Sequence, residues 1–150
     1  GSSQLGGHSS VLQASDIQLS RGESISDTAR VLSRYVDLII VRCFEHQMMI
    51  DLAKNSSVPV INGLTDQSHP CQVMADILTI EENKGSLSNQ NILWIGDGNN
   101  NMSNSLIEAA GKFNFKLKIG CPKKYSPNKS ILNLAKKEKV KLTHYSKGGG

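Results

Sequence analysis

Asn91-Ile92-Leu93-Trp94-Ile95-Gly96 is an almost continuous apolar run that leads directly into the polar residues 97–105. A second run of this kind, Val36-Asp37-Leu38-Ile39-Ile40-Val41, lies further upstream. Strands that are buried on both faces of a parallel sheet have this pattern, because no face of them meets water. The two runs therefore predict parallel β-structure.

Working outward from these runs, short apolar segments alternate with helix-like segments whose apolar residues recur every three or four positions. The signal Ser24-x-x-Asp27 is typical of a helix start. This alternation predicts an α/β fold with parallel sheets, flanking helices and right-handed crossovers. The expected strands cover residues 10–13, 36–41, 58–61, 91–96, 115–119 and 140–143, and the expected helices cover 26–35, 46–55, 70–84, 102–113 and 128–139.

A polar stretch at residues 83–89 marks the expected domain boundary. We expect residues 1–84 and 85–147 to be parts of two Rossmann-like domains, joined by the helix that starts at Pro70, with a glycine tail at 148–150. Each part would hold about three strands, whereas complete doubly wound sheets usually have about five or six.

The composition indicates an ordered protein. Of 150 residues, 38% are hydrophobic and 20% are charged, which excludes a charge-rich disordered chain. No apolar run approaches the ~20 residues of a membrane-spanning helix. The first residues have no signal-peptide pattern, and the three cysteines have no CxxC spacing. These features predict reduced thiols in a cytoplasmic protein, with no membrane contact.

The charge is unevenly distributed along the chain. Residues 1–111 carry 12 acidic and 6 basic side chains, whereas residues 112–150 carry 11 lysines and one acid. Such a basic segment could bind nucleic acid through its phosphates. However, the lysines alternate with apolar residues, as in Phe115-Lys116-Leu117-Lys118-Ile119. This alternation favours a strand with one solvated face, and we expect no nucleic-acid partner.

Two candidate site segments follow predicted strands, where open α/β sheets collect their ligands. Arg42 comes directly after residues 36–41, and its guanidinium could grip phosphate or carboxylate oxygens, or else pair with Glu45. After the strand at 58–61, Pro70 suits the first turn of a helix and places His69 at its N-cap. His69 and Gln72 could hold the two ends of a planar amide-like group, or could simply cap the helix.

The third candidate segment is the turn at residues 96–105. It resembles a dinucleotide-binding turn, but Asn101 stands where the third glycine of GxGxxG is needed. A polar cradle for a small zwitterion fits this asparagine run better, and an Asn-rich turn with left-handed (αL) residues and an N-cap is the structural alternative. The sequence has no GxSxG, Walker or HExxH motif, and its four histidines lack ligand spacing, so no metal or cofactor is expected.

Together these segments resemble the aspartate/ornithine carbamoyltransferase family, and within it the ornithine carbamoyltransferases. The resemblance runs over roughly residues 4–147, through residues 4–8, 21–35, 42, 58–66, His69-Pro70-Cys71-Gln72 and 94–101 in this order. Asn99, Asn100 and Asn101 differ from the Ser-Arg pair of aspartate enzymes, which favours ornithine as the acceptor. Putrescine and acetylornithine stay open as other acceptors.

The resemblance implies transfer of a carbamoyl group from carbamoyl phosphate to L-ornithine, a step of arginine biosynthesis or the urea cycle, without metal or cofactor. By motif position, the catalytic residues would be Arg42, His69 and Gln72. Carbamoyl phosphate would bind to Gln18, Arg42, His69, Pro70, Cys71 and Gln72, with Gln18 reaching it from a neighbouring subunit of a homotrimer. Asn101, or its neighbour Asn100, would bind ornithine.

The departures from the family pattern are as informative as the matches. The Ser-Thr-Arg-Thr-Arg phosphate element and the Ser-Met-Gly and His-Cys-Leu-Pro elements of the family are absent from this sequence. The chain thus resembles the middle of such an enzyme, and we expect it to be weakly active or inactive alone. A non-catalytic ligand-binding α/β module is the alternative function.

Overall fold

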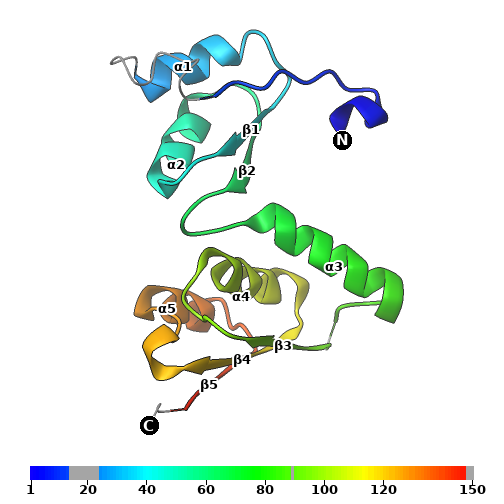
Figure 1. Cartoon of the computed structure of the whole chain (residues 1–150), viewed down its shortest axis with the longest axis vertical. Helices are drawn as coiled ribbons and strands as arrows, with labels where there is room; N and C mark the ends of the chain where they lie inside the picture. Colours follow the sequence, from blue (N-terminus) through cyan, green and yellow to red (C-terminus); the bar gives the residue numbers. More distant parts are fainter. Residues whose placement is uncertain (14–23, 89, 148–150) are drawn as a thin grey trace. The chain divides into compact units, whose positions relative to one another are not determined.

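The computed structural model of the chain describes residues 1–13, 24–88 and 90–147. Its contacts group the chain into two compact units, Gly1–Ile39 with Ile50–Val60, and Ile40–Met49 with Ile61–Gly150. Strands and helices alternate along the chain as the sequence predicts (Figure 1). Both sheets are parallel and flanked by helices, which confirms the predicted α/β class. No helix in the described ranges is long and apolar enough to cross a membrane.

The first unit contains the short 3-10 helix η1 (Ser2–Leu5) and helix α1 (Ile25–Leu32). Helix α1 begins as predicted, because the Ser24 hydroxyl accepts a hydrogen bond from the Asp27 amide at 3.2 Å. The strand expected at residues 10–13 was a wrong prediction: these residues form no regular structure, and Val11 is 85% exposed. A strand needs a hydrogen-bonded neighbour, and a four-residue apolar pattern does not supply one.

A two-stranded sheet is formed by β1 (Ile39–Arg42) and β2 (Val60–Leu64), with α2 (His46–Asn55) between them in the sequence. The Cys43 amide donates to the Leu64 carbonyl at 3.0 Å, just beyond the end of β1. Gly63 is needed here, since a Cβ at this position would lie 3.0 Å from the Val41 carbonyl oxygen. The carboxyl ends of β1 and β2 therefore share one edge of the sheet.

The second sheet has the order β3 (Asn91–Ile95), β4 (Lys116–Pro122) and β5 (Leu142–Lys147), and both pairs are parallel. Trp94 lies beside Ile119, which in turn lies beside His144. Helices α3 (Pro70–Lys84), α4 (Asn101–Phe113) and α5 (Lys129–Lys137) and the 3-10 turn η3 (Lys123–Tyr125) complete this unit.

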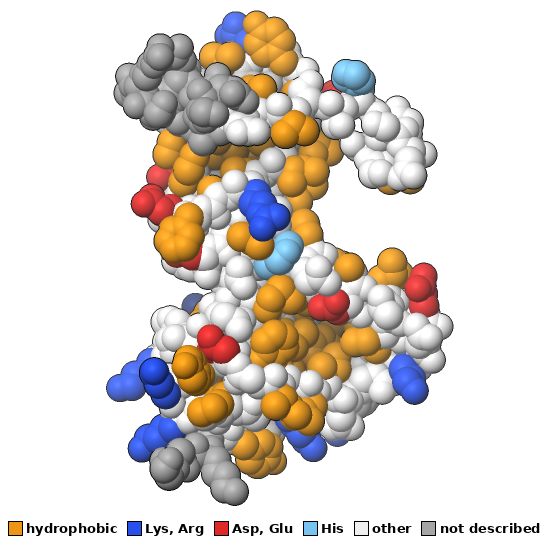
Figure 2. All heavy atoms as spheres, in the orientation of Figure 1, with side chains coloured by type: hydrophobic (Ala, Val, Ile, Leu, Met, Phe, Trp, Pro, Cys, Tyr) orange, Lys and Arg blue, Asp and Glu red, His pale blue; other side chains and the backbone are white. Residues whose placement is uncertain are grey.

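One core joins these helices to one face of the second sheet. Leu117 and Ile119 of β4 are fully buried, whereas Lys116 and Lys118 on the other face are exposed. The predicted strand with one solvated face is thus confirmed. Figure 2 shows Lys and Arg side chains on the surface of this unit. The buried cluster consists of Val73, Ile77, Leu87, Leu106, Ile107, Ala109, Ala110, Phe115, Leu117, Ile119, Cys121 and Ala135.

Candidate functional site

Arg42 is the last residue of β1, and its side chain is exposed. It lies at the same sheet edge as the loop that follows β2, because the next amide, that of Cys43, bonds to Leu64. The alternative of a surface ion pair with Glu45 is not found in the described part of the chain, where the ion pair is Arg30–Asp27. The guanidinium is therefore available to a ligand at this edge.

The loop at residues 65–69, which follows β2, is held tightly by its own hydrogen bonds. The Thr65 amide donates to the Ser68 carbonyl at 2.9 Å, and the Ser68 amide donates to the Thr65 hydroxyl at 3.2 Å. From the start of α2, Nδ1 of His46 lies 2.8 Å from the Thr65 hydroxyl, and the His46 amide donates to the Asp66 carboxylate. Thr65 is fully buried, so this loop is a fixed element rather than a loose connection.

His69 ends this loop as the N-cap of α3, with Pro70 at the first helical position as predicted. Its side chain makes no capping hydrogen bond, and its Nδ1 atom is buried without a partner. The alternative that the imidazole merely caps the helix is therefore wrong. A buried ring nitrogen with no partner is a costly arrangement, and a ligand with a complementary polar atom would relieve it.

Gln72 and Cys71 occupy the first turn of α3, and both are exposed. Gln72 does not cap the helix: its Nε2 donates to the Asp76 carboxylate at 3.0 Å, one turn further along. The Cys71 thiol donates to the carbonyl of Asn62 in β2 at 3.3 Å. The amide oxygen of Gln72 is thus the polar group of this turn that can accept from a ligand.

The turn at residues 96–101 is built from side chain to backbone hydrogen bonds. Gly96 has a φ of 133°, which an L side chain rarely adopts. Asn100 is the N-cap of α4: its Oδ1 accepts from the Ser103 amide at 2.9 Å, and its Nδ2 donates to the Asp97 carbonyl at 3.0 Å. The N-cap of the structural alternative is therefore present at Asn100, but the expected left-handed residues are not, because none of the asparagines at 99–101 has a positive φ.

Helix α4 brings this turn and the 65–69 loop together. Asn101 donates its Nδ2 to the Thr65 carbonyl at 2.9 Å, across 36 residues of sequence. Asn104 donates to the Gln67 carbonyl, and Ser105 accepts from the His69 amide. Asn101 is a sequence-predicted site residue, whereas Asn104 and Ser105 are not. Their three- and four-residue spacing from Asn101, which places them on the same helix face, is the signal that could have identified them.

One predicted site residue lies outside the described residues. Gln18 falls within residues 14–23, which the structure does not describe. Across the described ranges, no group of three His, Cys, Asp or Glu side chains could hold a metal ion.

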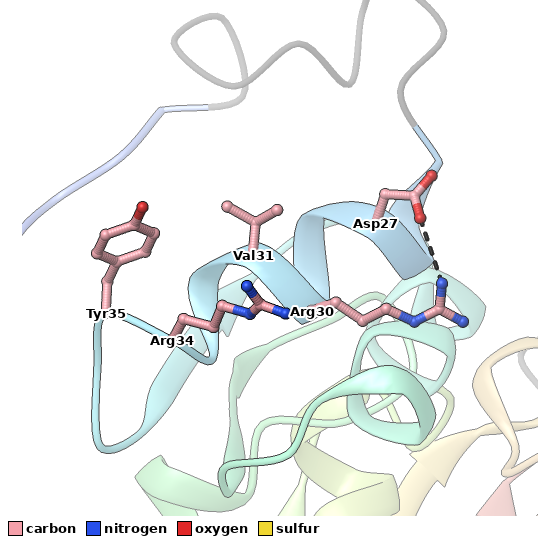
Figure 3. Close-up of a pocket in the computed structure, with 5 residues that line it drawn as sticks. All are labelled: Asp27, Arg30, Val31, Arg34 and Tyr35. Atoms are coloured by element: carbon pink, nitrogen blue, oxygen red, sulfur yellow. Dashed lines mark hydrogen bonds and ion pairs between the residues drawn. The ribbon is translucent and has the colours of Figure 1, made fainter.

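A surface depression of about 330 Å³ lies on α1 and the turn after it, and it contains none of the predicted site residues (Figure 3). Arg30 in its lining pairs with Asp27 at 3.4 Å, but both side chains are largely exposed, so this pair contributes little stability. The lining consists of Asp27, Arg30, Val31, Arg34 and Tyr35.

Two ionisable groups near the site have shifted pKa values. Burial raises the pKa of the Cys43 thiol, and the carboxylates of Asp66 and Glu45 raise it further. A backbone hydrogen bond from Met49 lowers this pKa in part. Partial burial also raises the pKa of Glu108 on α4, and the neighbouring charge of Glu138 adds to this shift. Neither group forms a hydrogen bond with His69, so we assign neither to the site.

Comparisons with known proteins cover almost the entire chain. A family model described as the carbamoyl-P binding domain of aspartate/ornithine carbamoyltransferase matches residues 1–82. A second model, the Asp/Orn binding domain of the same family, matches residues 88–147.

Curated relatives include the ornithine carbamoyltransferase of Ruegeria pomeroyi, which is 47% identical over 93% of this chain and 45% of its own length. The corresponding protein of Rhizorhabdus wittichii is 53% identical over 86% of this chain and 41% of its own length. The chain thus spans about half the length of these relatives.

Solved structures give the same result. Ornithine carbamoyltransferase from Pyrococcus furiosus superposes with a TM-score of 0.87 at 43% identity, over 96% of this chain and 47% of that one. The enzyme from Burkholderia thailandensis gives 0.85 at 41% identity, over 95% and 48% of the two chains.

Proposed function

The chain belongs to the aspartate/ornithine carbamoyltransferase family, and from this premise we propose that the protein of which it forms part is an ornithine carbamoyltransferase. The reaction is transfer of the carbamoyl group of carbamoyl phosphate to the δ-amine of L-ornithine, which yields L-citrulline and phosphate. Two observations support ornithine as the acceptor: the names of the similar proteins and the asparagine run at residues 99–101.

The observation that carries the proposal is the environment of His69. Its Nδ1 is buried and unpartnered at the N-terminus of α3, and its loop is bonded to Asn101 of the asparagine turn. A histidine held in this way can contact the carbamoyl group. Helix α4, which holds the loop of this histidine through Asn101, also carries the asparagines proposed to bind the acceptor. The first-turn N–H groups of α3 favour a ligand with negative charge at this position.

The chemistry then follows from the residue types. As the ornithine amine attacks the carbamoyl carbon, a C–N bond forms, the C–O bond to phosphate breaks and the amine loses a proton. Arg42 and His69 stabilise the negative charge that develops on the carbonyl oxygen, and Arg42 also holds phosphate. Gln72 orients the carbamoyl NH₂ through its amide oxygen, because its Nε2 is already bonded to Asp76.

The remaining roles follow the family pattern. Pro70, Cys71 and Gln18 complete the carbamoyl-phosphate site, Gln18 from a neighbouring subunit of a homotrimer, and Asn101 or Asn100 binds the amino-acid end of ornithine. Residues 1–84 then belong to the carbamoyl-phosphate domain and residues 85–147 to the ornithine domain. The setting is cytoplasmic arginine biosynthesis or a urea-cycle-type step. The 150-residue chain by itself has little or no activity, because it lacks the Ser-Thr-Arg-Thr-Arg phosphate element.

The test is citrulline formation by the full-length protein that contains this chain, with ornithine, aspartate, putrescine and acetylornithine compared as acceptors. We expect turnover with ornithine and a loss of about 10²-fold or more in kcat for His69→Ala, the typical cost of one oxyanion donor. His8→Ala, a change at an exposed histidine, is the matched control. Preference for another acceptor, or full activity of His69→Ala, would contradict the proposal. Citrulline formation by the 150-residue chain alone would refute the expectation that it is inactive.

A further inference from the structure

We propose that Ser105 is a positioning residue for His69, and that three side chains of α4 fix the place of this histidine. These three side chains are Asn101, Asn104 and Ser105. The proposal rests on the proposed function, since it assigns a task within the same site. The residues that it adds lie on α4, the helix that carries the asparagines proposed to bind ornithine. They act on His69, which is proposed to contact the carbamoyl group.

The contacts between α4 and the 65–69 loop are regular. Asn101 donates to the Thr65 carbonyl at 2.9 Å, Asn104 donates to the Gln67 carbonyl at 3.0 Å, and Ser105 accepts from the His69 amide at 2.7 Å. Residues one, four and five of a helix share a face, and the loop residues they bind are 65, 67 and 69. One helix face thus binds every second residue of the loop that leads to the imidazole.

Two of these polar side chains are buried. Ser105 is 4% exposed and Asn104 is 7% exposed, although both are polar. The other buried polar side chain of α4, Ser103, belongs to the capping box with Asn100. A buried hydroxyl or carboxamide is unfavourable unless it has a hydrogen-bond partner. The Ser105 hydroxyl and the Asn104 Nδ2 atom find such partners in backbone groups of the 65–69 loop, whereas the Asn104 Oδ1 atom is buried without a partner among the described residues.

The backbone of His69 is restrained on both sides. As the N-cap, His69 stands outside the helix, with φ −138° and ψ 68°, and its imidazole makes no capping bond. No hydrogen bond of the side chain to the described residues is found that would anchor the residue. The Ser105 hydroxyl holds its amide on one side, and Pro70, with its fixed φ, restrains it on the other. Loss of the Ser105 hydroxyl frees this end of the loop, and the imidazole moves with it.

The direct test is amide hydrogen exchange at His69, read by NMR in the full-length protein and its Ser105→Ala variant. We expect exchange to become about 10-fold faster at His69, in keeping with the loss of one buried hydrogen bond. Ser105→Thr, which keeps the hydroxyl, restores slow exchange. Ser130→Ala, at an exposed serine of α5, leaves it unchanged. Asn104→Ala is a second probe of the same loop, and it also speeds exchange at His69.

The kinetic readout separates positioning from a merely structural role. Per folded molecule, Ser105→Ala lowers kcat about 10-fold and changes the KM for ornithine less than about 2-fold, and Ser105→Thr recovers most of the loss. Unchanged exchange at His69 in both Ser105→Ala and Asn104→Ala would overturn the proposal, as would unchanged kcat with faster exchange. If the unmodified protein forms no citrulline, the proposed function fails and this assignment fails with it, even where the exchange result shows the contact.

Discussion

The turn before α4 leaves no room for a side chain at Gly98, and this makes Gly98→Ala an informative perturbation. A Cβ at this position would lie 3.0 Å from the Tyr125 carbonyl oxygen, 3.1 Å from Cδ of Pro127 and 3.2 Å from Sγ of Cys121. The first two neighbours are backbone and a ring, so they cannot rotate away. The Gly98 amide also donates to the Tyr125 carbonyl at 2.9 Å, and the new methyl group would push this contact apart.

The size of the effect follows from these contacts. Overpacking a tight site typically costs about 1–3 kcal/mol, and weakening one hydrogen bond adds about 1 kcal/mol. We therefore expect the free energy of unfolding to fall by roughly 3 kcal/mol. For a chain of this length, this corresponds to a decrease in Tm on the order of 8 °C.

The assay is thermal unfolding followed by circular dichroism, with Gly120→Ala as the matched control. At Gly120, the nearest atom to an added Cβ is the Trp94 carbonyl oxygen at 3.9 Å, which is an ordinary contact. Alanine there restricts the unfolded chain and should leave Tm unchanged or slightly raised. Equal Tm values for the two variants would refute the reasoning, because they would mean that the crowding around Gly98 is absent or relaxes without cost.

Three other changes test separate features of the molecule. Ile107→Ala removes a fully buried side chain from the core between α4 and the sheet, and we expect urea denaturation to show a loss of about 2–5 kcal/mol; a loss below 1 kcal/mol would contradict this core. Glu108→Gln removes a carboxylate whose pKa is raised by partial burial and by the charge of Glu138. Ionisation of this carboxyl in the folded protein therefore lowers the free energy of unfolding as the pH rises through the raised pKa. The variant should therefore be more stable than the parent at pH 7 by a few tenths of a kcal/mol, with the difference vanishing below about pH 4; a constant difference across this range would exclude the titration as its cause. Alkylation with iodoacetamide followed by mass spectrometry should modify the exposed Cys71 well before the buried Cys121, and the reverse order would contradict their burial.

Much of the fold could be predicted because it follows from the local periodicity of apolar residues along the chain. Helix α3 spans the predicted residues 70–84, and β3 differs from its predicted range by one residue. The boundaries moved where the pattern was short: β2 begins at Val60 and runs on to Leu64, past the predicted end at residue 61. The expected strand at 10–13 failed for the same reason, since a few apolar residues in alternation do not show whether a neighbouring strand exists.

The site was predictable to a similar depth. The sequence placed His69 at a helix start and an N-cap in the asparagine run, because both depend on residues within one turn of each other. It left Asn101 and Asn100 undecided, and the structure gives them different contacts, one to the Thr65 carbonyl and one to the Ser103 amide. The question of which one binds the acceptor stays a prediction.

The sequence by itself determined the alternation of strands and helices, the helix caps and the order of motifs, because each depends on residues close together in the chain. Tertiary structure alone decided that the face of α4 closes on the 65–69 loop and that Gly98 lies against Tyr125. These contacts join residues 36 positions apart in the first case and 27 in the second. A buried polar group must find a partner, but only the folded chain brings one within hydrogen-bond distance.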